Sequence, residues 1–258
     1  MNKIANTEHY NQAMAKSMID KLFFLDMAVD LSSVVDFGCA DGTLLKWVHQ
    51  FCPELKLIGY DNNNDMLESA ASNFPEGKYY DDFDRLCDNT DRKGTLINLS
   101  SVIHEVYSYS SSMEVDKFWK DVFKNDFEYI AIRDMMFSDT SLRPTPIRDE
   151  MKVRCAIRDS GKQNMLTEFE MLHGPISVYK NFMHFLLKYR YEENWKREVH
   201  ENYFPISTNE FFNKVPKEYE VIIYERYALP FTVDRVKKDF DVEISDNTHI
   251  KMLLRRKS

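Results

Sequence analysis

Glycine is scarce in this chain, with seven residues among 258. Two of the seven, Gly38 and Gly42, lie within five residues of each other and directly follow a β-forming run at 34–37. A chain with so little glycine is expected to use it where the backbone must turn with a positive φ. The segment 36–42 therefore predicts a strand that turns tightly into a helix and binds a small ligand at the turn.

Cysteine is also sparse, and the four residues are scattered without a C-x-x-C pair. In a chain of this length, that pattern indicates free thiols in a reducing compartment. No stretch approaches the roughly 18 apolar residues of a membrane span, and residues 1–10 lack the apolar core of a signal peptide. We therefore expect a cytoplasmic protein without a membrane partner.

The chain lacks an excess of basic residues. It has 34 Lys and Arg against 42 Asp and Glu, which gives a net charge of −8. Domains that bind nucleic acid generally are usually basic, so a nucleic-acid partner is disfavoured, although a local basic patch would suffice. Hydrophobic residues make up 43% of the chain, which is enough for a packed core. Nothing in the composition indicates an oligomeric state.

Short apolar runs typical of strands alternate with apolar residues at helical spacing along the first half of the chain. Strands are expected at 33–37, 56–60, 78–81, 95–99 and 129–133, and helices at 14–29, 44–51, 64–74 and 115–123. Two further strands are expected at 219–229 and 248–255, while 230–247 shows no pattern that places it. This order predicts an α/β protein with a seven-stranded, mostly parallel sheet and helices on both faces.

The connection between the fifth and sixth strands is unusually long. Residues 136–218 number 83, whereas a crossover helix with its loops takes roughly 20 to 30. We expect this segment to form a largely helical, substrate-binding cap with a helix at 176–189. Residues 1–135 and 219–258 then form the sheet domain.

The acids near the glycine turn indicate the kind of ligand. The pattern D-x-G-x-x-x-G lacks the G-x-G-x-x-G of dinucleotide-binding folds, and Asp36 would repel a pyrophosphate. Asp61 ends the second expected strand, where an acid accepts hydrogen bonds from a ribose diol. Asp82 and Phe83 follow the third strand and are expected near an adenine edge. The alternative is that Asp61 only caps a helix and Asp82 lies in a solvated loop.

Residues 36–42, Asp61 and the segment 98–105 together resemble the nucleotide-binding motifs of class I S-adenosylmethionine (SAM)-dependent methyltransferases. The resemblance covers about 30–135 and, more loosely, the last two strands. It implies a Rossmann-like fold with SAM as the cofactor. The implied cofactor-binding residues are Asp36, Gly38, Ala40, Gly42, Asp61, Asn62, Asp82, Phe83, Asn98 and Ser100. Asn98 departs from the acid that is frequent there, and its amide would orient the donor's ammonium without a charge.

Two residues at the ends of later strands are the catalytic candidates. His104 follows the fourth strand and is suited to deprotonate an acceptor near neutral pH, although a packed or capping histidine is the alternative. Arg133 ends the fifth strand, where it would face the acceptor or pair with a neighbour. His104-Glu105 lacks the second histidine of H-E-x-x-H, so no metal site is predicted.

The function that fits this pattern is a methyltransferase that acts by in-line displacement, for which positioning supplies most of the rate. The acidic balance and the aromatic cap favour a small-molecule acceptor. An RNA or protein acceptor, held by the basic residues of 143–162, is the second choice. An enzyme that cleaves SAM and a regulator that only binds it also remain open. The chain has no Asp/Asn-Pro-Pro-Tyr motif after the fourth strand, which disfavours methylation of DNA bases.

Overall fold

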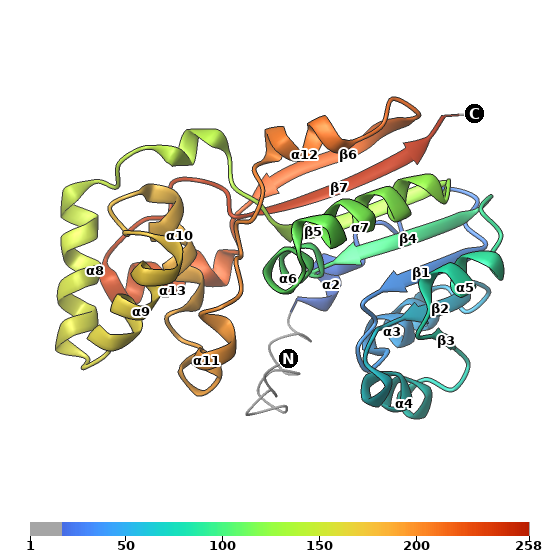
Figure 1. Ribbon diagram of the computed structural model, residues 1–258, viewed down its shortest axis with the longest axis horizontal. Coiled ribbons are helices and arrows are strands. Elements are labelled where there is room, and N and C mark those ends of the chain that lie inside the picture. Colours follow the sequence, from blue (N-terminus) through green and yellow to red (C-terminus); the bar gives the residue numbers. More distant parts are fainter. Residues whose placement is uncertain (1–16, 258) are drawn as a thin grey trace.

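The computed structural model describes residues 17–257, which contain one seven-stranded sheet. The strands are β1 (Ser33–Phe37), β2 (Lys56–Tyr60), β3 (Lys78–Tyr80), β4 (Thr95–Ser100), β5 (Tyr129–Met135), β6 (Tyr219–Tyr227) and β7 (His249–Arg256). Their order across the sheet is β3-β2-β1-β4-β5-β7-β6 (Figure 1). β1 to β5 are parallel, and β7 runs antiparallel to both β5 and β6. The predicted fold class is confirmed.

Helices follow most strands. Those of the sheet domain are α2 (Met18–Lys21), α3 (Thr43–Phe51), α4 (Asn64–Asn73), α5 (Phe83–Asp88), α6 (Ile103–Tyr109), α7 (Ser112–Lys124) and α12 (Thr208–Lys214). The others are α8 (Ile147–Asp159), α9 (Gln163–His173), α10 (Tyr179–Lys188), α11 (Trp195–Glu198) and α13 (Pro230–Phe240), with 3₁₀ turns η1 (Asp139–Leu142) and η2 (Glu192–Asn194).

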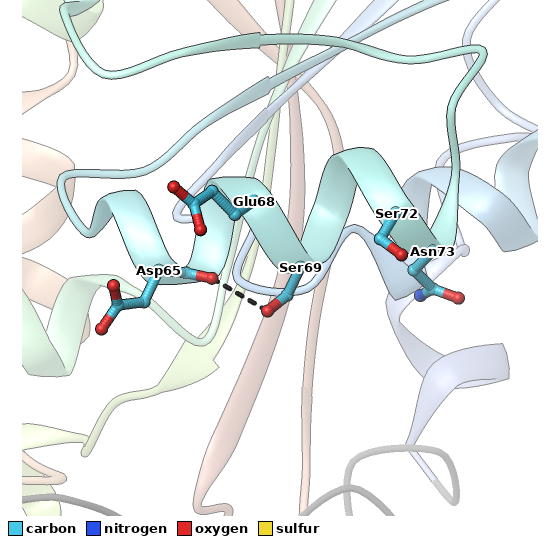
Figure 2. Close-up of a pocket in the computed structure, with 5 residues that line it drawn as sticks. All are labelled: Asp65, Glu68, Ser69, Ser72 and Asn73. Carbon is cyan, nitrogen blue, oxygen red and sulfur yellow. Dashed lines mark hydrogen bonds between the residues drawn. The ribbon is translucent and has the colours of Figure 1, made fainter.

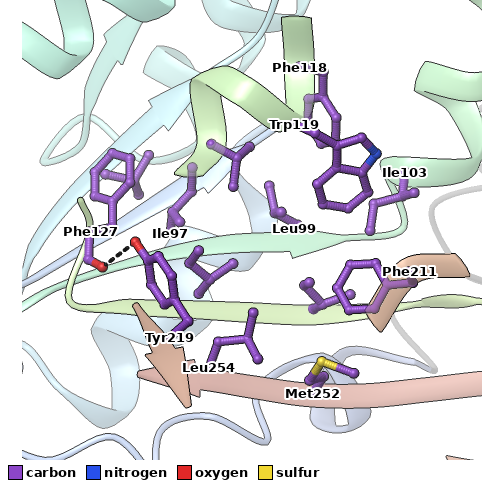
Figure 3. Packing of buried hydrophobic residues seen from close by; sticks show 14 of the residues in the cluster. Ile97, Leu99, Ile103, Phe118, Trp119, Phe127, Phe211, Tyr219, Met252 and Leu254 are labelled. Atoms are coloured by element: carbon purple, nitrogen blue, oxygen red, sulfur yellow. Dashed lines mark hydrogen bonds between the residues drawn. The ribbon is translucent and has the colours of Figure 1, made fainter. Parts of the chain in front are cut away.

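Alternate residues of each central strand enter two different hydrophobic clusters. Leu96 of β4 faces the cluster that α2 and α3 complete, whereas Ile97 and Leu99 face the cluster of α6, α7 and α12. Figure 3 shows the second cluster, in which Trp119 of α7 lies over the strands. Helices thus cover both faces of the sheet, so a functional site is expected at the polar ends of the strands.

The cap has a hydrophobic cluster of its own. Helices α8, α9, α10 and α13 gather in a lobe beside the sheet (Figure 1). α13 comes from the connection between β6 and β7, yet its Val236 and Phe240 are buried in this lobe. Phe211 of α12 instead packs on the sheet. The proposed division at 136–218 stays a prediction.

Two expectations about helices need correction. The helix expected at 14–29 is only the four-residue α2 where the structure describes it, and residues 14–16 lie outside that part. After Lys21 the chain continues in turns, with the Ala28 amide bonded to the Phe24 carbonyl. The unplaced segment 230–247 contains α13, which begins with Pro230 at its first turn. Within residues 17–257, no helix is both long and apolar enough to cross a membrane.

Candidate functional site

The glycine turn between β1 and α3 is held by backbone contacts. The amides of Gly38 and Cys39 both donate to the Tyr60 carbonyl of β2, at 2.8 and 2.9 Å. Gly38 and Gly42 have φ values of 75° and 73°. A Cβ atom would lie 3.0 Å from a Val102 methyl group at Gly38 and 3.2 Å from the Ala70 Cβ at Gly42. Both glycines are therefore required by conformation and by space.

Asp61 fastens this turn to the end of β2. Its Oδ2 accepts the Ala40 amide at 3.0 Å, and its Oδ1 accepts the Asn63 amide at 2.9 Å. Ala40 itself has a φ of 46°, so the hydrogen bond stabilises a strained turn. Each carboxylate oxygen keeps a second lone pair, which leaves Asp61 able to accept from a ligand hydroxyl. Asn62 is exposed and makes no side-chain hydrogen bond within residues 17–257.

A chain of polar side chains connects β1 to β4 on the face covered by α2. Asp36 and Asn98 are partners in the parallel register. Asn98 Nδ2 donates to Asp36 Oδ1 at 2.7 Å, and Ser100 Oγ donates to Asn98 Oδ1 at 2.8 Å. Burial raises the pKa of Asp36 to about 6, although the Asn98 hydrogen bond opposes this shift. This buried carboxyl would ionise more readily beside a cationic ligand.

Asp82 and Phe83 lie at the end of β3. Asp82 caps α5 by accepting the Arg85 amide at 2.8 Å. The half-buried Phe83 ring lies 5.1 Å from the Phe37 ring and 5.4 Å from the Tyr60 ring. Three aromatic rings therefore meet beside the ends of β1 and β2, where a flat heterocycle could stack.

His104 forms a buried pair with Asp134 of β5, and this partner was not predicted. His104 Nδ1 lies 2.7 Å from Asp134 Oδ1, and Asp134 Oδ2 accepts the Ile103 and His104 amides at 2.7 and 3.3 Å. Burial alone would lower the pKa of His104, but the charge and hydrogen bond of Asp134 outweigh it and raise that pKa. Asp134 thus orients the ring and leaves Nε2 for proton transfer.

The cap covers the open side of His104. The Nε2 atom of His104 lies 3.9 Å from Glu201 Oε2, and Tyr203 packs edge-on against the His104 imidazole ring. His104, Glu105 and Glu201 bring possible metal-ligand atoms within 4.8 Å of one another. Arg197, however, bonds to both carboxylates, to Glu201 at 2.8 Å and to Glu105 at 2.9 Å. A single guanidinium of the cap therefore bridges the two carboxylates and offsets one of their two charges.

Arg133 is buried on the α2 face, at the strand next to β4. Its Nε donates to Asp20 Oδ2 at 2.8 Å and to the Tyr227 hydroxyl at 3.1 Å, and Nη1 is 3.4 Å from Ser101 Oγ. Nη2 has no hydrogen-bond partner, the only such buried side-chain atom within residues 17–257. An unsatisfied buried donor costs about 1–3 kcal/mol, so this nitrogen is a candidate contact for a ligand.

Lys21 of α2 is a site residue that sequence reasoning missed. The side chain is 4% exposed, and burial lowers the pKa of its ammonium to about 8. Charges of Arg133, Asp36 and Asp134 act on it, so it lies at the same edge of the sheet. No local pattern marks it, because its burial comes from the packing of α2 over strands far away in the sequence.

A shallow hollow lies away from this cluster, on the outer face of α4 (Figure 2). It is lined by Asp65, Glu68, Ser69, Ser72 and Asn73. Ser69 Oγ donates to the Asp65 carbonyl at 2.8 Å within the same helix. None of the residues that line this hollow was predicted for the site, and the acids at the strand ends do not reach it. We therefore place the candidate site at the carboxyl edge of β1, β4 and β5.

Comparison with solved structures identifies the fold. A SAM-dependent methyltransferase from Archaeoglobus fulgidus matches with a TM-score of 0.50 at 11% identity, over 94% of each chain. The plantazolicin methyltransferase BamL, solved with a triazolic desmethylPZN analog and SAH, matches with a TM-score of 0.49 at 8% identity, over 95% of this chain and 84% of that one. The chain has the fold of the class I SAM-dependent methyltransferases. No protein-family model and no curated protein matches its sequence.

The predicted site residues can now be located within this fold. The predicted residues Asp36, Asp61 and Asn98 meet around the glycine turn, at the ends of β1, β2 and β4. His104 and Arg133 lie farther along the same edge and on opposite faces of the sheet, since Arg133 and the His104 partner Asp134 are consecutive residues of β5.

Proposed function

We propose that this protein is a SAM-dependent methyltransferase that acts on a small-molecule acceptor. The observation that supports the proposal most directly is the hydrogen-bonded chain from Asp36 through Asn98 to Ser100, beside a glycine turn that Asp61 fastens. It lies in a fold shared with a SAM-dependent methyltransferase from Archaeoglobus fulgidus. A buried carboxyl whose pKa is raised fits the positive charge of such a donor.

The residues around the turn would hold the donor. Asp61 has lone pairs for the ribose hydroxyls, and the ring of Phe83 offers a stacking surface for adenine. Asp36, which Asn98 orients, would pair with the ammonium of the methionine end. When bound, SAM supplies an electrophilic methyl group for in-line transfer to the acceptor.

His104 is the proposed general base. Asp134 fixes its Nδ1, so Nε2 is the atom that would take a proton from an acceptor hydroxyl or amine. Glu201 and Tyr203 cover this side of the ring, so the acceptor reaches Nε2 only when the cap opens there. The remaining rate enhancement would come from positioning the two reactants, about 7–11 kcal/mol at most.

Calorimetry with S-adenosylhomocysteine (SAH) tests the donor site. We expect wild-type protein to bind SAH and Asp61→Ala to lose about 1–3 kcal/mol of that affinity, the cost of a lost charged hydrogen bond. Asp61→Asn keeps an acceptor oxygen and should fall between the two. Asp65→Ala removes an exposed carboxylate on α4 and serves as the control. Equal SAH affinity in all four proteins would refute the assignment of Asp61.

Incubation with methyl-labelled SAM separates the possible activities. Release of SAH only when an acceptor mixture is added supports methyl transfer, and His104→Ala should then lower turnover without changing SAH affinity. Fragmentation of SAM alone would indicate a cleaving enzyme. Binding without turnover for any small molecule, RNA or protein acceptor would indicate a regulator, and either result contradicts our proposal.

A further inference from the structure

The α2 face of the sheet edge holds more positive charge than its direct contacts neutralise. Arg133 and Lys251 are register partners on β5 and β7, and Lys21 of α2 lies over the same edge. Asp20 forms ion pairs with both Arg133 and Lys251: its carboxylate lies 2.8 Å from Arg133 Nε and 2.6 Å from Lys251 Nζ. Two of the three cations therefore share one carboxylate, and Lys21 has no ion pair with it.

The other acids near Lys21 are already engaged. Asp36 accepts from Asn98, Asp134 holds His104 and two amides of α6, and Glu105 pairs with Arg197. The Lys21 side chain is 4% exposed, and its ammonium is stabilised by the charges of Asp36, Asp134 and Glu105. A largely buried ammonium is costly without a compensating charge, so an anionic ligand beside it would be favourable.

Arg133 is the second group prepared for an anion. Arg133 is 4% exposed. Its Nη2 atom has no hydrogen-bond partner among residues 17–257, and its Nη1 atom has a long contact of 3.4 Å to Ser101 Oγ. The two terminal nitrogens of a guanidinium form a planar fork that matches the two oxygens of a carboxylate. Ser101 follows β4 directly and has a φ of 60°, so this fork lies next to the end of the Asp36–Asn98–Ser100 chain.

The position points to the acceptor rather than the donor. The proposed donor residues lie at the ends of β1 to β4, and Arg133 lies on β5, one strand farther along the edge. The cap is attached at the end of this same strand. We propose, given the methyltransferase activity proposed above, that the acceptor is a small molecule with a carboxylate, which Arg133 and Lys21 recognise beside the methyl-transfer site.

Paired fragments test this proposal on the wild-type protein without any substitution. Benzoate and its uncharged amide, benzamide, are titrated into SAH-loaded protein and followed by ligand-observed NMR. We expect benzoate to bind about tenfold or more tightly than benzamide, because only the acid can receive the charged hydrogen bonds. Equal affinities, or no saturable binding of benzoate, would overturn the proposal.

Substitutions then locate the preference. Arg133→Gln should abolish the preference for benzoate, Arg133→Lys should keep part of it, and Lys21→Gln should reduce it. Arg158→Gln is the matched control, because this exposed arginine of α8 pairs with its neighbour Asp159 and lies outside the proposed site. Circular dichroism confirms that each variant is folded. A preference that survives both Arg133→Gln and Lys21→Gln would overturn the proposal.

A third measurement distinguishes the acceptor from the donor's own carboxylate. Methylthioadenosine keeps the nucleoside of SAH but lacks its amino acid. If Arg133→Gln weakens the binding of SAH and leaves that of methylthioadenosine unchanged, Arg133 holds the carboxylate of the donor and the acceptor proposal is wrong. We expect both ligands to bind the variant as they bind the wild type. Wild-type protein that fails to bind SAH would instead refute the proposed function itself.

Discussion

Asp36 is a site residue whose charge depends on its surroundings. Only 4% of it is exposed, and its contacts are the Asn98 amide and the more distant charges of Lys21 and Asp61. Burial disfavours the ionised form, which is why the pKa of this carboxyl is raised to about 6. Donor binding should therefore depend on pH in a range where most carboxyls do not titrate.

We expect SAH affinity to fall as the pH is lowered through about 6, since protonation removes the charge that would pair with the ligand's ammonium. The difference between the ionised and protonated states should approach the roughly 1.5–3 kcal/mol of a hydrogen bond to a charged group. Calorimetric titrations across this range measure it. Asp36→Asn should bind weakly and show little pH dependence. Parallel curves for the two proteins would rule out this role for Asp36.

Site residues whose roles follow from a local sequence pattern could be predicted, whereas site residues whose positions are set by tertiary packing could not. Gly38, Gly42 and Asp61 were predictable, because a turn and a strand end have local patterns. Lys21 and the pairing of His104 with Asp134 were not, because they are set by how α2 and α6 cross distant strands. His104 and Asp134, for example, are 30 residues apart in the chain.

Among the elements, α6 depends on a carboxylate that belongs to another element. Its first turn is capped not by its own N-terminal residue but by Asp134 of β5, which accepts the amides of Ile103 and His104. The same carboxylate accepts the Met135 amide at 2.7 Å. The catalytic candidate is therefore positioned by the strand on which its partner lies.

Asp134→Asn should lower the free energy of unfolding by about 3–5 kcal/mol, because it removes one member of a buried, hydrogen-bonded pair and turns an NH₂ group towards donors. Glu114→Gln alters an exposed carboxylate in the capping box of α7 and should cost much less. Urea unfolding of the two variants provides the comparison. Similar losses in both would mean that the Asp134 contacts contribute little to stability.

The strands were largely predictable, whereas several helices were not, and α13 is an instructive example. All seven strands were expected within a few residues of their bounds. Buried parallel strands such as β1, β4 and β5 form short apolar runs, which makes them easy to find. α13 was not expected, although Val233, Val236 and Phe240 follow Pro230 at helical spacing. Its packing partner, the cap, is not adjacent in sequence, so no local rule could assign it to that lobe.

The whole molecule has two kinds of hydrophobic core, one on the faces of the sheet and one in the cap. α13 contributes Phe240 to the cap cluster, where its ring lies 4.7 Å from that of Tyr189. The polypeptide therefore passes into this lobe twice, once after β5 and again after β6.

Phe240→Ala should loosen the cap and leave the donor site intact. Removing a buried phenylalanine costs about 3–5 kcal/mol, and here the cost falls on the lobe rather than on the sheet. Limited proteolysis should therefore cleave the cap faster, while SAH affinity stays unchanged. Phe231→Ala, at a half-exposed position of the same helix, is the control. Loss of SAH binding in Phe240→Ala would show that the two parts depend on each other.

The late position of α13 and β7 in the chain has a consequence for biosynthesis. β7 lies between β5 and β6 in the sheet, and α13 completes the cap cluster. A nascent chain that has not yet reached these elements has an unpaired edge on β5 and an open apolar lobe, both of which favour aggregation. Neither the sheet nor the cap can finish folding on the ribosome before α13 and β7 have been made. Truncation shortly before α13 should therefore yield insoluble protein rather than a smaller folded protein.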